Sequence, residues 1–146
     1  MNEMHDCTFC KLLTDELEVS MVYQDDYCSA FMDIQPINAG HLLVVPNTHA
    51  SCLAELTEED GAQMFRVAQR LAKTLRLSDS KCEGINFFLA DGEAAGQEVF
   101  HVHLHVFPRY VGDGFGFRFP PTYSKMPERR ELNAVAEKIR GHLAKK

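Results

Sequence analysis

The feature that most constrains this chain is the stretch 100–107, in which histidine alternates with large apolar residues. Side chains of a β-strand point alternately to opposite faces. A strand here therefore places His101, His103 and His105 on one face and their apolar neighbours on the other, where they can pack into a core. Imidazole is a nucleophile, a proton carrier near neutral pH and a metal ligand. Three histidines on an otherwise apolar strand predict a chemical site as well as a packing surface.

Periodicity and turn residues elsewhere predict a sheet with helices beside it. The range 58–75 is the clearest helix, because Thr57 is a good N-cap, acidic residues fill the first turn and apolar residues recur at three- and four-residue steps. The other predicted helices are 8–15 and 128–144, and the predicted strands are 19–24, 27–32, 41–45, 84–90 and 99–107. The expected fold is α+β, an antiparallel sheet of about five strands with one long helix packed on it and a C-terminal helix, in a single domain over residues 1–146.

Amino-acid composition and charge limit the binding partners and the cellular compartment that we expect for this chain. A net charge of −6 argues against binding of nucleic acid, which needs many cations facing phosphates. No apolar run approaches a membrane span, and the first residues lack the basic and apolar regions of a signal peptide. The five cysteines are an odd number, which argues against a disulfide framework as the basis of the fold. We therefore expect a cytoplasmic protein without nucleic-acid or membrane partners.

The residues alone leave three interpretations of the histidine strand. The first is a polar strand facing solvent, although Thr, Lys or Glu would be more usual there. The second is a metal site made by the three histidines, with an open coordination position. The third uses one histidine as a nucleophile, with its neighbours orienting it and moving protons.

Cys7 and Cys10 have the Cys-x-x-Cys spacing of many tetrahedral zinc sites. One such pair is a weak signal. Two buried thiols explain it equally well, and a redox pair belongs in a βαβ context that the sequence does not show. For a zinc site, His49 and one triad histidine are available as further ligands, and four protein ligands would make the site closed and structural.

The segment His101-Val102-His103-Leu104-His105-Val106-Phe107 resembles the His-φ-His-φ-His-φ-φ signature of the histidine triad (HIT) superfamily of nucleotide hydrolases and transferases. The segments 33–49 and 92–97, and Pro108-Arg109 after the triad, resemble the family in the same order. The resemblance implies that His103 attacks the α-phosphorus of a nucleotide and forms a nucleotidyl-histidine, which water then hydrolyses. It also implies that His105 and Gln97 assist by binding a phosphate or bridging oxygen or, for His105, by carrying a proton.

The resemblance further implies a metal centre. In zinc-bearing members the first triad histidine is a ligand, so the implied structural zinc set is Cys7, Cys10, His49 and His101. This assignment gives His101 a role separate from that of the nucleophile. No magnesium is expected, because no carboxylate cluster accompanies the site.

The nucleotide site implied by the resemblance uses residues from the first third of the chain. Asp33 would accept the ribose hydroxyls, and Phe9, Phe31 and Ile34 would form an apolar slot for the base. His41 joins the histidine network or caps its strand. The expected ligand is an adenine-type nucleotide, and the expected substrates are dinucleoside polyphosphates or nucleoside phosphoramidates. Members of the family commonly form dimers, so the resemblance also implies a homodimer with the long helix and a sheet edge at the interface.

Two residues depart from the family pattern. Ala90 stands where many members have Asn, and Glu98 stands where they have Ser or Thr. An alanine side chain cannot hydrogen-bond, and a carboxylate near a phosphate repels it. These departures keep a second hypothesis open, a nucleotide-binding module that does not catalyse.

Overall fold

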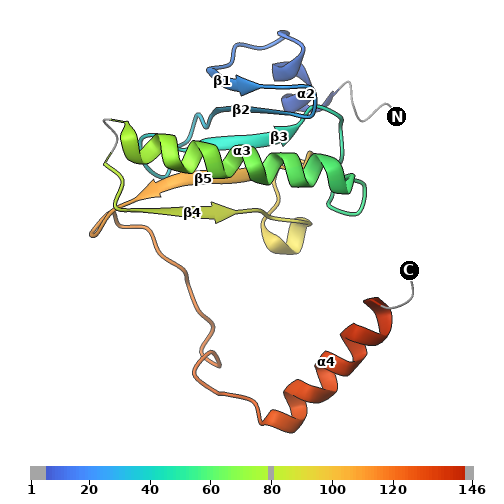
Figure 1. Ribbon diagram of the computed structural model, residues 1–146. Helices are drawn as coiled ribbons and strands as arrows, with labels where there is room; N and C mark the ends of the chain where they lie inside the picture. Colours follow the sequence, from blue (N-terminus) through green and yellow to red (C-terminus); the bar gives the residue numbers. More distant parts are fainter. Residues whose placement is uncertain (1–5, 79–80, 144–146) are drawn as a thin grey trace. The chain divides into compact units, whose positions relative to one another are not determined.

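The computed structural model describes residues 6–78 and 81–143 (Figure 1). The chain divides into two units, Met1–Phe115 and Gly116–Lys146, which are taken in turn. Among the described residues, the first unit holds every strand and the long helix α3, and the second holds helix α4. Within the same ranges no helix is both long and apolar enough to cross a membrane.

The first unit is built on a five-stranded antiparallel sheet with the order β1-β2-β3-β5-β4. Its strands are Met21–Gln24 (β1), Cys28–Met32 (β2), Leu42–Pro46 (β3), Gly84–Phe88 (β4) and Leu104–Arg109 (β5). A turn at Asp25 joins β1 to β2, where the Asp25 carboxylate accepts the backbone N–H groups of Tyr27 and Cys28, each at 2.8 Å. The predicted α+β fold with five antiparallel strands is confirmed.

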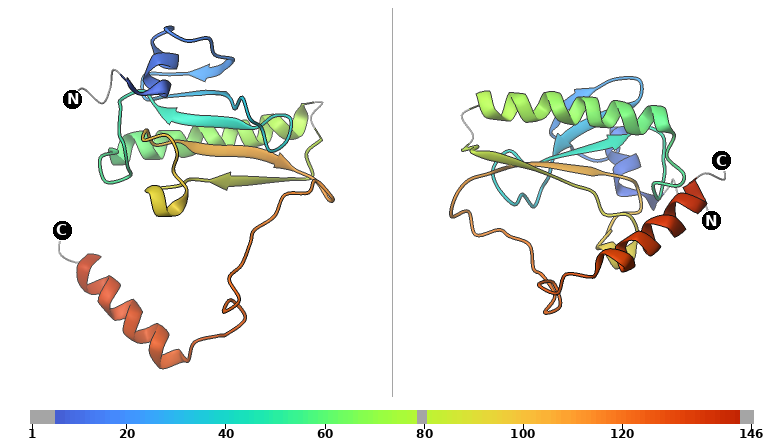
Figure 2. Two further views of the ribbon diagram at one scale, coloured as in Figure 1. Left: turned by 180° about the vertical axis from the view of Figure 1, so that it is seen from behind. Right: turned by 60° about the horizontal axis from the view of Figure 1, so that its bottom comes forward.

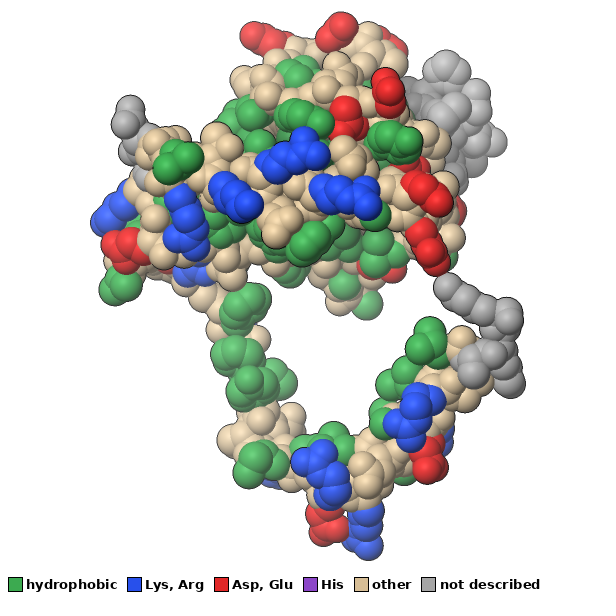
Figure 3. Space-filling view, viewed as in Figure 1, with side chains coloured by type: hydrophobic (Ala, Val, Ile, Leu, Met, Phe, Trp, Pro, Cys, Tyr) green, Lys and Arg blue, Asp and Glu red, His purple; other side chains and the backbone are tan. Residues whose placement is uncertain are grey.

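Helix α3 (Glu58–Leu77) covers one face of this sheet (Figures 1 and 2). Thr57 caps the helix by accepting a hydrogen bond from the Asp60 N–H at 3.1 Å. Basic side chains gather along its solvent-facing side (Figure 3). Its buried stripe packs on β2, β3 and β5 and consists of Met64, Val67, Ala68, Leu71 and Leu75. The predicted helix 58–75 is confirmed and continues to Leu77.

A second, smaller core lies on the opposite face of the sheet. Helix α2 (Thr8–Leu13) places Phe9 there, in a cluster with Phe31 of β2 and with Leu43 and Val45 of β3. Because side chains alternate along a strand, the neighbours of these residues on β2 and β3 face α3 instead. The sheet therefore has a covered face on each side, and α2 marks the side where the histidines lie.

The histidine stretch is not one continuous strand, which corrects the predicted range 99–107. β5 begins only at Leu104, because the pairing of β3 with β5 ends at Val44 opposite Leu104. Continuing that register would set Val102 opposite Pro46, which has no N–H to donate. The Val102 N–H instead donates to the Ala50 carbonyl at 2.8 Å.

Side chains of the histidine stretch still point alternately to the two faces of the sheet, although the strand is interrupted. Val102, Leu104 and Val106 all belong to the core beneath α3. His101 and His103 are buried on the other side, with exposed fractions of 0 % and 6 %. The predicted separation of histidines from apolar residues therefore holds, although irregular backbone carries the first two histidines.

The other boundaries differ by a few residues. Helix α2 ends at Leu13 rather than at 15, because Asp15 adopts a left-handed φ of 59°. Strand β4 ends at Phe88 rather than at 90, and β5 runs through Pro108 to Arg109.

The second unit contains helix α4 (Arg129–Leu143), near the predicted range 128–144, of which residue 144 lies outside the described residues. None of its residues is buried. Its apolar stripe is exposed and consists of Leu132, Val135, Ile139 and Leu143. Residues 116–128 carry no helix or strand.

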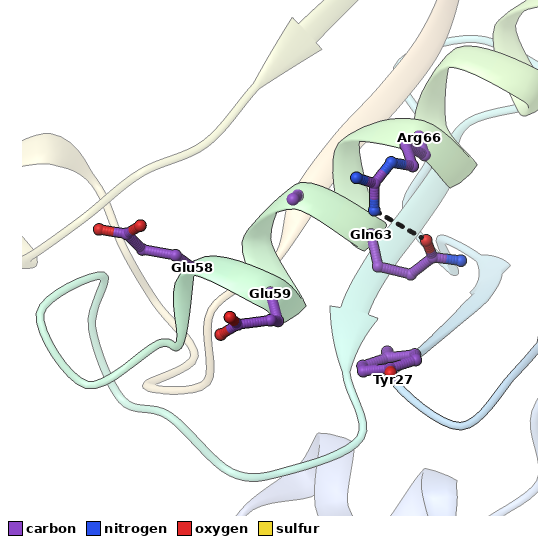
Figure 4. Close-up of a pocket in the computed structure, with 6 residues that line it drawn as sticks. Tyr27, Glu58, Glu59, Gln63 and Arg66 are labelled. Atoms are coloured by element: carbon purple, nitrogen blue, oxygen red, sulfur yellow. Dashed lines mark hydrogen bonds between the residues drawn. The ribbon is translucent and has the colours of Figure 1, made fainter.

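A surface hollow of about 360 Å³ lies between the β1–β2 turn and the first half of α3 (Figure 4). It is lined by Tyr27, Glu58, Glu59, Ala62, Gln63 and Arg66. None of these residues is a histidine or a cysteine. The predicted chemistry therefore lies elsewhere, on the α2 side of the sheet.

Candidate active site and metal centre

The described residues contain two groups of side chains that could hold a metal ion. One consists of Cys7, Cys10, His49 and His101, and the other consists of Asp33, His41 and His105. Within each group the ligand atoms lie within 4.8 Å of one another. His103 belongs to neither group and sits between them, with its ring 5.0 Å from that of His105.

The Cys/His group joins three segments that are distant in sequence. Cys7 and Cys10 flank the first turn of α2, His49 follows β3, and His101 precedes β5. The Cys7 Sγ lies 3.5 Å from Nδ1 of His101, and the Cys10 Sγ lies 3.4 Å from Nδ1 of His49 and 3.6 Å from Nδ1 of His101. Zn–S and Zn–N bonds of about 2.3 and 2.0–2.1 Å set tetrahedral S and N ligands roughly 3.6 Å apart. The donor atoms therefore have the spacing of a closed zinc site.

Hydrogen bonds outside this group orient its histidine rings. Nε2 of His101 lies 2.9 Å from the Pro46 carbonyl, which can only accept, so the proton of the neutral ring is on Nε2 and the Nδ1 lone pair faces both sulfurs. Nε2 of His49 lies 3.3 Å from the Ser51 hydroxyl, which leaves Nδ1 facing Cys10. Such outer partners commonly fix ligand orientation at zinc sites.

The pKa values of the group indicate which charge states it adopts without a metal ion. Burial, together with the neighbouring Cys7, raises the pKa of the Cys10 thiol to about 11. Burial lowers the pKa of His101 to about 4, so its ring is neutral near pH 7. Two thiolates side by side are therefore unfavourable in the protein alone, and a divalent cation would offset their repulsion.

Of the two nitrogens of the His103 ring, only Nδ1 has a hydrogen-bond partner among the described residues. Its Nδ1 lies 2.7 Å from the carbonyl oxygen of His101, so Nδ1 carries a proton and donates it. In the neutral ring Nε2 then carries a lone pair, which is the nucleophilic form of imidazole. Phe9 supports the ring, with centroids 5.2 Å apart in an edge-on contact.

His41 and His105 form a chain of hydrogen bonds with a defined direction. The Ile37 backbone N–H donates to Nδ1 of His41 at 3.0 Å, so in the neutral His41 ring the proton is on Nε2. Nε2 of His41 then donates to Nδ1 of His105 at 2.9 Å. A neutral His105 carries its own proton on Nε2, where it can donate to a ligand.

The surroundings keep both of these rings neutral near pH 7. Burial lowers the pKa of His41. Burial, with smaller effects from His103 and His41, lowers the pKa of His105 to about 4. Asp33 lies nearby, with Oδ2 3.5 Å from Nε2 of His41 and 3.8 Å from Nδ1 of His105, and it opposes these shifts in part.

Comparison with known proteins identifies the chain. The family model described as "HIT domain" matches residues 14–112. The chain belongs to the HIT family. This family model covers the sheet, α3 and all three triad histidines.

Relatives and solved structures agree with this assignment. "Protein hit" of Bacillus subtilis is 39% identical over 145 residues, 99% of each chain. "Adenosine 5'-monophosphoramidase HNT1" of Saccharomyces cerevisiae is 35% identical over 103 residues, 70% of this chain and 62% of that protein. The crystal structure of a HIT family member from Bacillus subtilis has a TM-score of 0.87 at 34% identity, covering 97% of this chain and 99% of that one. A zinc-bound histidine triad family protein from Mycobacterium smegmatis has a TM-score of 0.74 at 35% identity, covering 95% and 99%.

Gln97, a predicted ligand of phosphate in this HIT protein, has its side chain occupied by backbone groups. Its Oε1 accepts the Gly92 N–H at 2.7 Å, and its Nε2 donates to the Ser51 and Val99 carbonyls at 2.8 and 3.1 Å. Both amide protons are therefore used. The structure assigns Gln97 to bracing the loop before the triad, and its contact with phosphate stays a prediction.

The other residues predicted to contact the nucleotide lie partly in the core and partly at the surface. Asp33 both caps its own turn, with Oδ1 accepting the Gln35 N–H at 2.8 Å, and faces His41 and His105 with Oδ2. Phe9 and Phe31 touch edge-on in the core, with centroids 5.6 Å apart. Ile34 is 96 % exposed. The ribose contact of Asp33 and the base slot stay predictions.

Ala90 and Glu98, the two departures from the HIT pattern, lie in different surroundings. Ala90 is buried, with an exposed fraction of 4 %. Glu98 is exposed. The Glu98 carboxylate is thus hydrated, which weakens any repulsion of a nearby phosphate.

Sequence reasoning missed several hydrogen-bond partners close to the histidines. Asn38 and Asp113 are 75 residues apart and meet at 2.8 Å. Asp113 lies between two glycines in an irregular segment, where no periodicity or spacing singles it out. The amide of Ile37 is equally invisible, because any residue but proline offers the same N–H group.

Proposed function

We propose that this HIT protein hydrolyses or transfers nucleotides at the α-phosphate through a covalent intermediate on His103. The observation that carries the proposal is the hydrogen bond from Nδ1 of His103 to the His101 carbonyl, which leaves the Nε2 lone pair as a nucleophile. Nε2 forms a bond to the α-phosphorus while the bond to the leaving group breaks with its electron pair. Water then attacks phosphorus, the P–N bond breaks, and a nucleoside monophosphate is released.

The neighbouring side chains supply binding and proton donation in this proposal. Nε2–H of His105 donates to a phosphate oxygen or to the leaving group. Asp33 accepts hydrogen bonds from the ribose hydroxyls with the oxygen that faces the histidines. An adenine-type nucleotide is the proposed ligand, supported by the yeast relative named as an adenosine monophosphoramidase. Dinucleoside polyphosphates and nucleoside phosphoramidates are both candidate substrates.

A structural zinc ion completes the proposal. Cys7, Cys10, His49 and His101 would hold it, supported by their mutual spacing and by the zinc-bound relative. When bound, the ion would cross-link the start of α2 to the segments after β3 and before β5. It would take no part in the transfer, because all four ligands come from the protein.

A homodimer is the proposed assembly. β4 is an edge strand, and on it Phe87 and Phe88 are 36 % and 44 % exposed. Phe65 of α3 meets Phe87 edge-on, with centroids 5.6 Å apart, so the apolar surface continues from the edge onto the helix. Phe65→Lys/Phe87→Lys should convert a dimer to a monomer in analytical ultracentrifugation, and a wild-type monomer would contradict the proposal.

The test of function combines turnover with detection of the intermediate. The protein is incubated with diadenosine polyphosphates and with adenosine 5'-phosphoramidate, AMP release is measured, and quenched samples are examined by intact-mass spectrometry for an adenylyl adduct. His103→Ala should lose about 10⁴-fold or more in kcat, the scale on which removal of a nucleophile is felt. Tight AMP binding with neither turnover nor adduct would instead support a binding module, the function that Ala90 and Glu98 keep open.

A further inference from the structure

Asp113 is a buried carboxylate away from both ligand groups. Its side chain is 3 % exposed. Arg109 holds it with two donors, Nε at 2.5 Å and Nη2 at 2.9 Å, and the backbone N–H groups of Tyr110 and Phe115 point to it at 3.4 and 3.1 Å. These donors hold the pKa of Asp113 far below its usual range. Because several donors hold the Asp113 carboxylate in place, its position is fixed, and a side chain that binds to it is held in place as well.

A further partner of Asp113 is Asn38, in the loop between Asp33 and His41. Nδ2 of Asn38 donates to Oδ2 of Asp113 at 2.8 Å and to the Pro108 carbonyl at 2.9 Å. The Asn38 carbonyl accepts the His41 backbone N–H at 3.1 Å. Asn38 therefore ties the loop to the end of β5.

The residue before Asn38 supplies the N–H group that sets the proton on His41. The Ile37 N–H donates to Nδ1 of His41 at 3.0 Å, and this bond can form only while the loop keeps its place. Aromatic packing supports the same ring, because Phe107 lies 4.9 Å from His41 and Phe115 lies edge-on to Phe107 at 5.6 Å. Phe115 in turn lies under the Arg109 guanidinium at 4.8 Å.

We propose that Asp113 and Asn38 are positioning residues that fix on which nitrogen His41 and His105 carry their protons. The inference rests on the proposed function, in which His105 faces the nucleotide phosphate. Without the Ile37 amide, His41 can carry its proton on Nδ1 and accept from His105 through Nε2. His105 would then present a lone pair, instead of an N–H group, to the phosphate.

The decisive measurement is the proton position in the free protein. Long-range ¹H–¹⁵N correlation of ¹⁵N-histidine protein should show His41 and His105 protonated on Nε2 in the wild type. Asn38→Ala should give a mixture of both tautomers at His41 and His105. Its kcat should fall by about tenfold with KM nearly unchanged, a part of the roughly 10²–10⁴-fold that a positioned proton donor contributes. Asp113→Asn should act in the same direction, and if it fails to fold, Asn38→Ala decides alone.

The matched control is Asn86→Ala. Asn86 accepts a hydrogen bond from Nη1 of the same Arg109 at 2.6 Å but lies on β4, away from the loop. It should leave the tautomers and kcat as in the wild type. A single Nε2 tautomer of His41 in Asn38→Ala, or an Nδ1 proton in the wild type, would overturn the proposal. Neither result depends on substrate, so the role of His103 is judged separately by its adduct.

Discussion

The two ligand groups on the α2 side of the sheet contain similar side chains, yet their surroundings suit them to different chemistry. In the Cys/His group, the Pro46 carbonyl takes the outer proton of His101, and the inner lone pair faces two sulfurs. In the other group, a backbone N–H takes the outer lone pair of His41, and the inner nitrogen carries a proton toward His105. A carbonyl behind the ring thus favours a metal ligand, and an amide behind the ring favours a proton donor.

This difference decides against a metal ion on His41, although the distances in its group would admit one. To bind a metal through Nε2, His41 would have to lose that proton, while the Ile37 amide prevents Nδ1 from accepting it. His105 and Asp33 would remain as only two ligands. The histidine network therefore suits the holding and passing of protons, and the cysteine group has the donor atoms and the spacing that could hold zinc.

Removing the two thiols should have the largest effect on the Cys/His group. Cys7→Ser/Cys10→Ser should abolish zinc binding and lower the free energy of unfolding by about 3 kcal/mol or more, a fraction of the roughly 10–16 kcal/mol that zinc supplies to isolated zinc fingers. Metal analysis and chemical denaturation measure both. Cys52→Ser is the matched control, because Cys52 is similarly half-buried but outside the group. Zinc retained in the double variant would place the metal on the triad.

One alanine substitution in each group should separate the role of His41 from that of His49. His41→Ala should lower kcat by about 10²-fold, because His105 loses the donor that orients its proton, and should leave zinc content unchanged. His49→Ala should lower zinc content, while His41 and His105 keep their Nε2 protons. Metal analysis, steady-state kinetics and histidine NMR of both variants give the result. Equal zinc loss in the two proteins would mean that the groups are not distinct.

A smaller effect is expected in the pH dependence of the free energy of unfolding, to which His105 should contribute. The pKa of His105 is lowered from its ordinary 6.5 to about 4, so between these values the unfolded chain binds more protons than the folded protein. The free energy of unfolding should therefore fall as the pH drops from 6.5 to about 4, by on the order of 1–3 kcal/mol from this group. His105→Asn should flatten that slope in denaturation curves. Added zinc should not restore the lost part; full restoration by zinc would assign the slope to the cysteine side.

Much of the architecture was predictable because it follows from periodicity. The apolar stripe of α3 and the alternation after Val99 are local patterns, and each determined a face of the fold. The interruption at residues 100–103 was not predictable, because it depends on which strand β5 meets and on Pro46 in that strand.

The candidate site likewise has parts that the sequence predicts and parts that it does not. The ligand types and the triad could be identified because their side chains are chemically distinctive. The positions of protons could not, since backbone groups such as the Pro46 carbonyl and the Ile37 amide decide them and no residue name reveals these. The link between Asn38 and Asp113 joins segments 75 residues apart, which only the folded chain brings together.

His101 contacts both the cysteines and His103, and this limits how the protein could be redesigned without a metal ion. Its ring faces the cysteines, while its own carbonyl holds the Nδ1 proton of His103. Replacing the cysteines with a well-packed apolar pair would keep the core filled but would remove the sulfur contacts of the His101 ring, so that only its bond to the Pro46 carbonyl and the Val102 N–H bond to Ala50 would hold this peptide. The orientation of the His103 ring in such a metal-free variant would therefore depend on these two remaining hydrogen bonds.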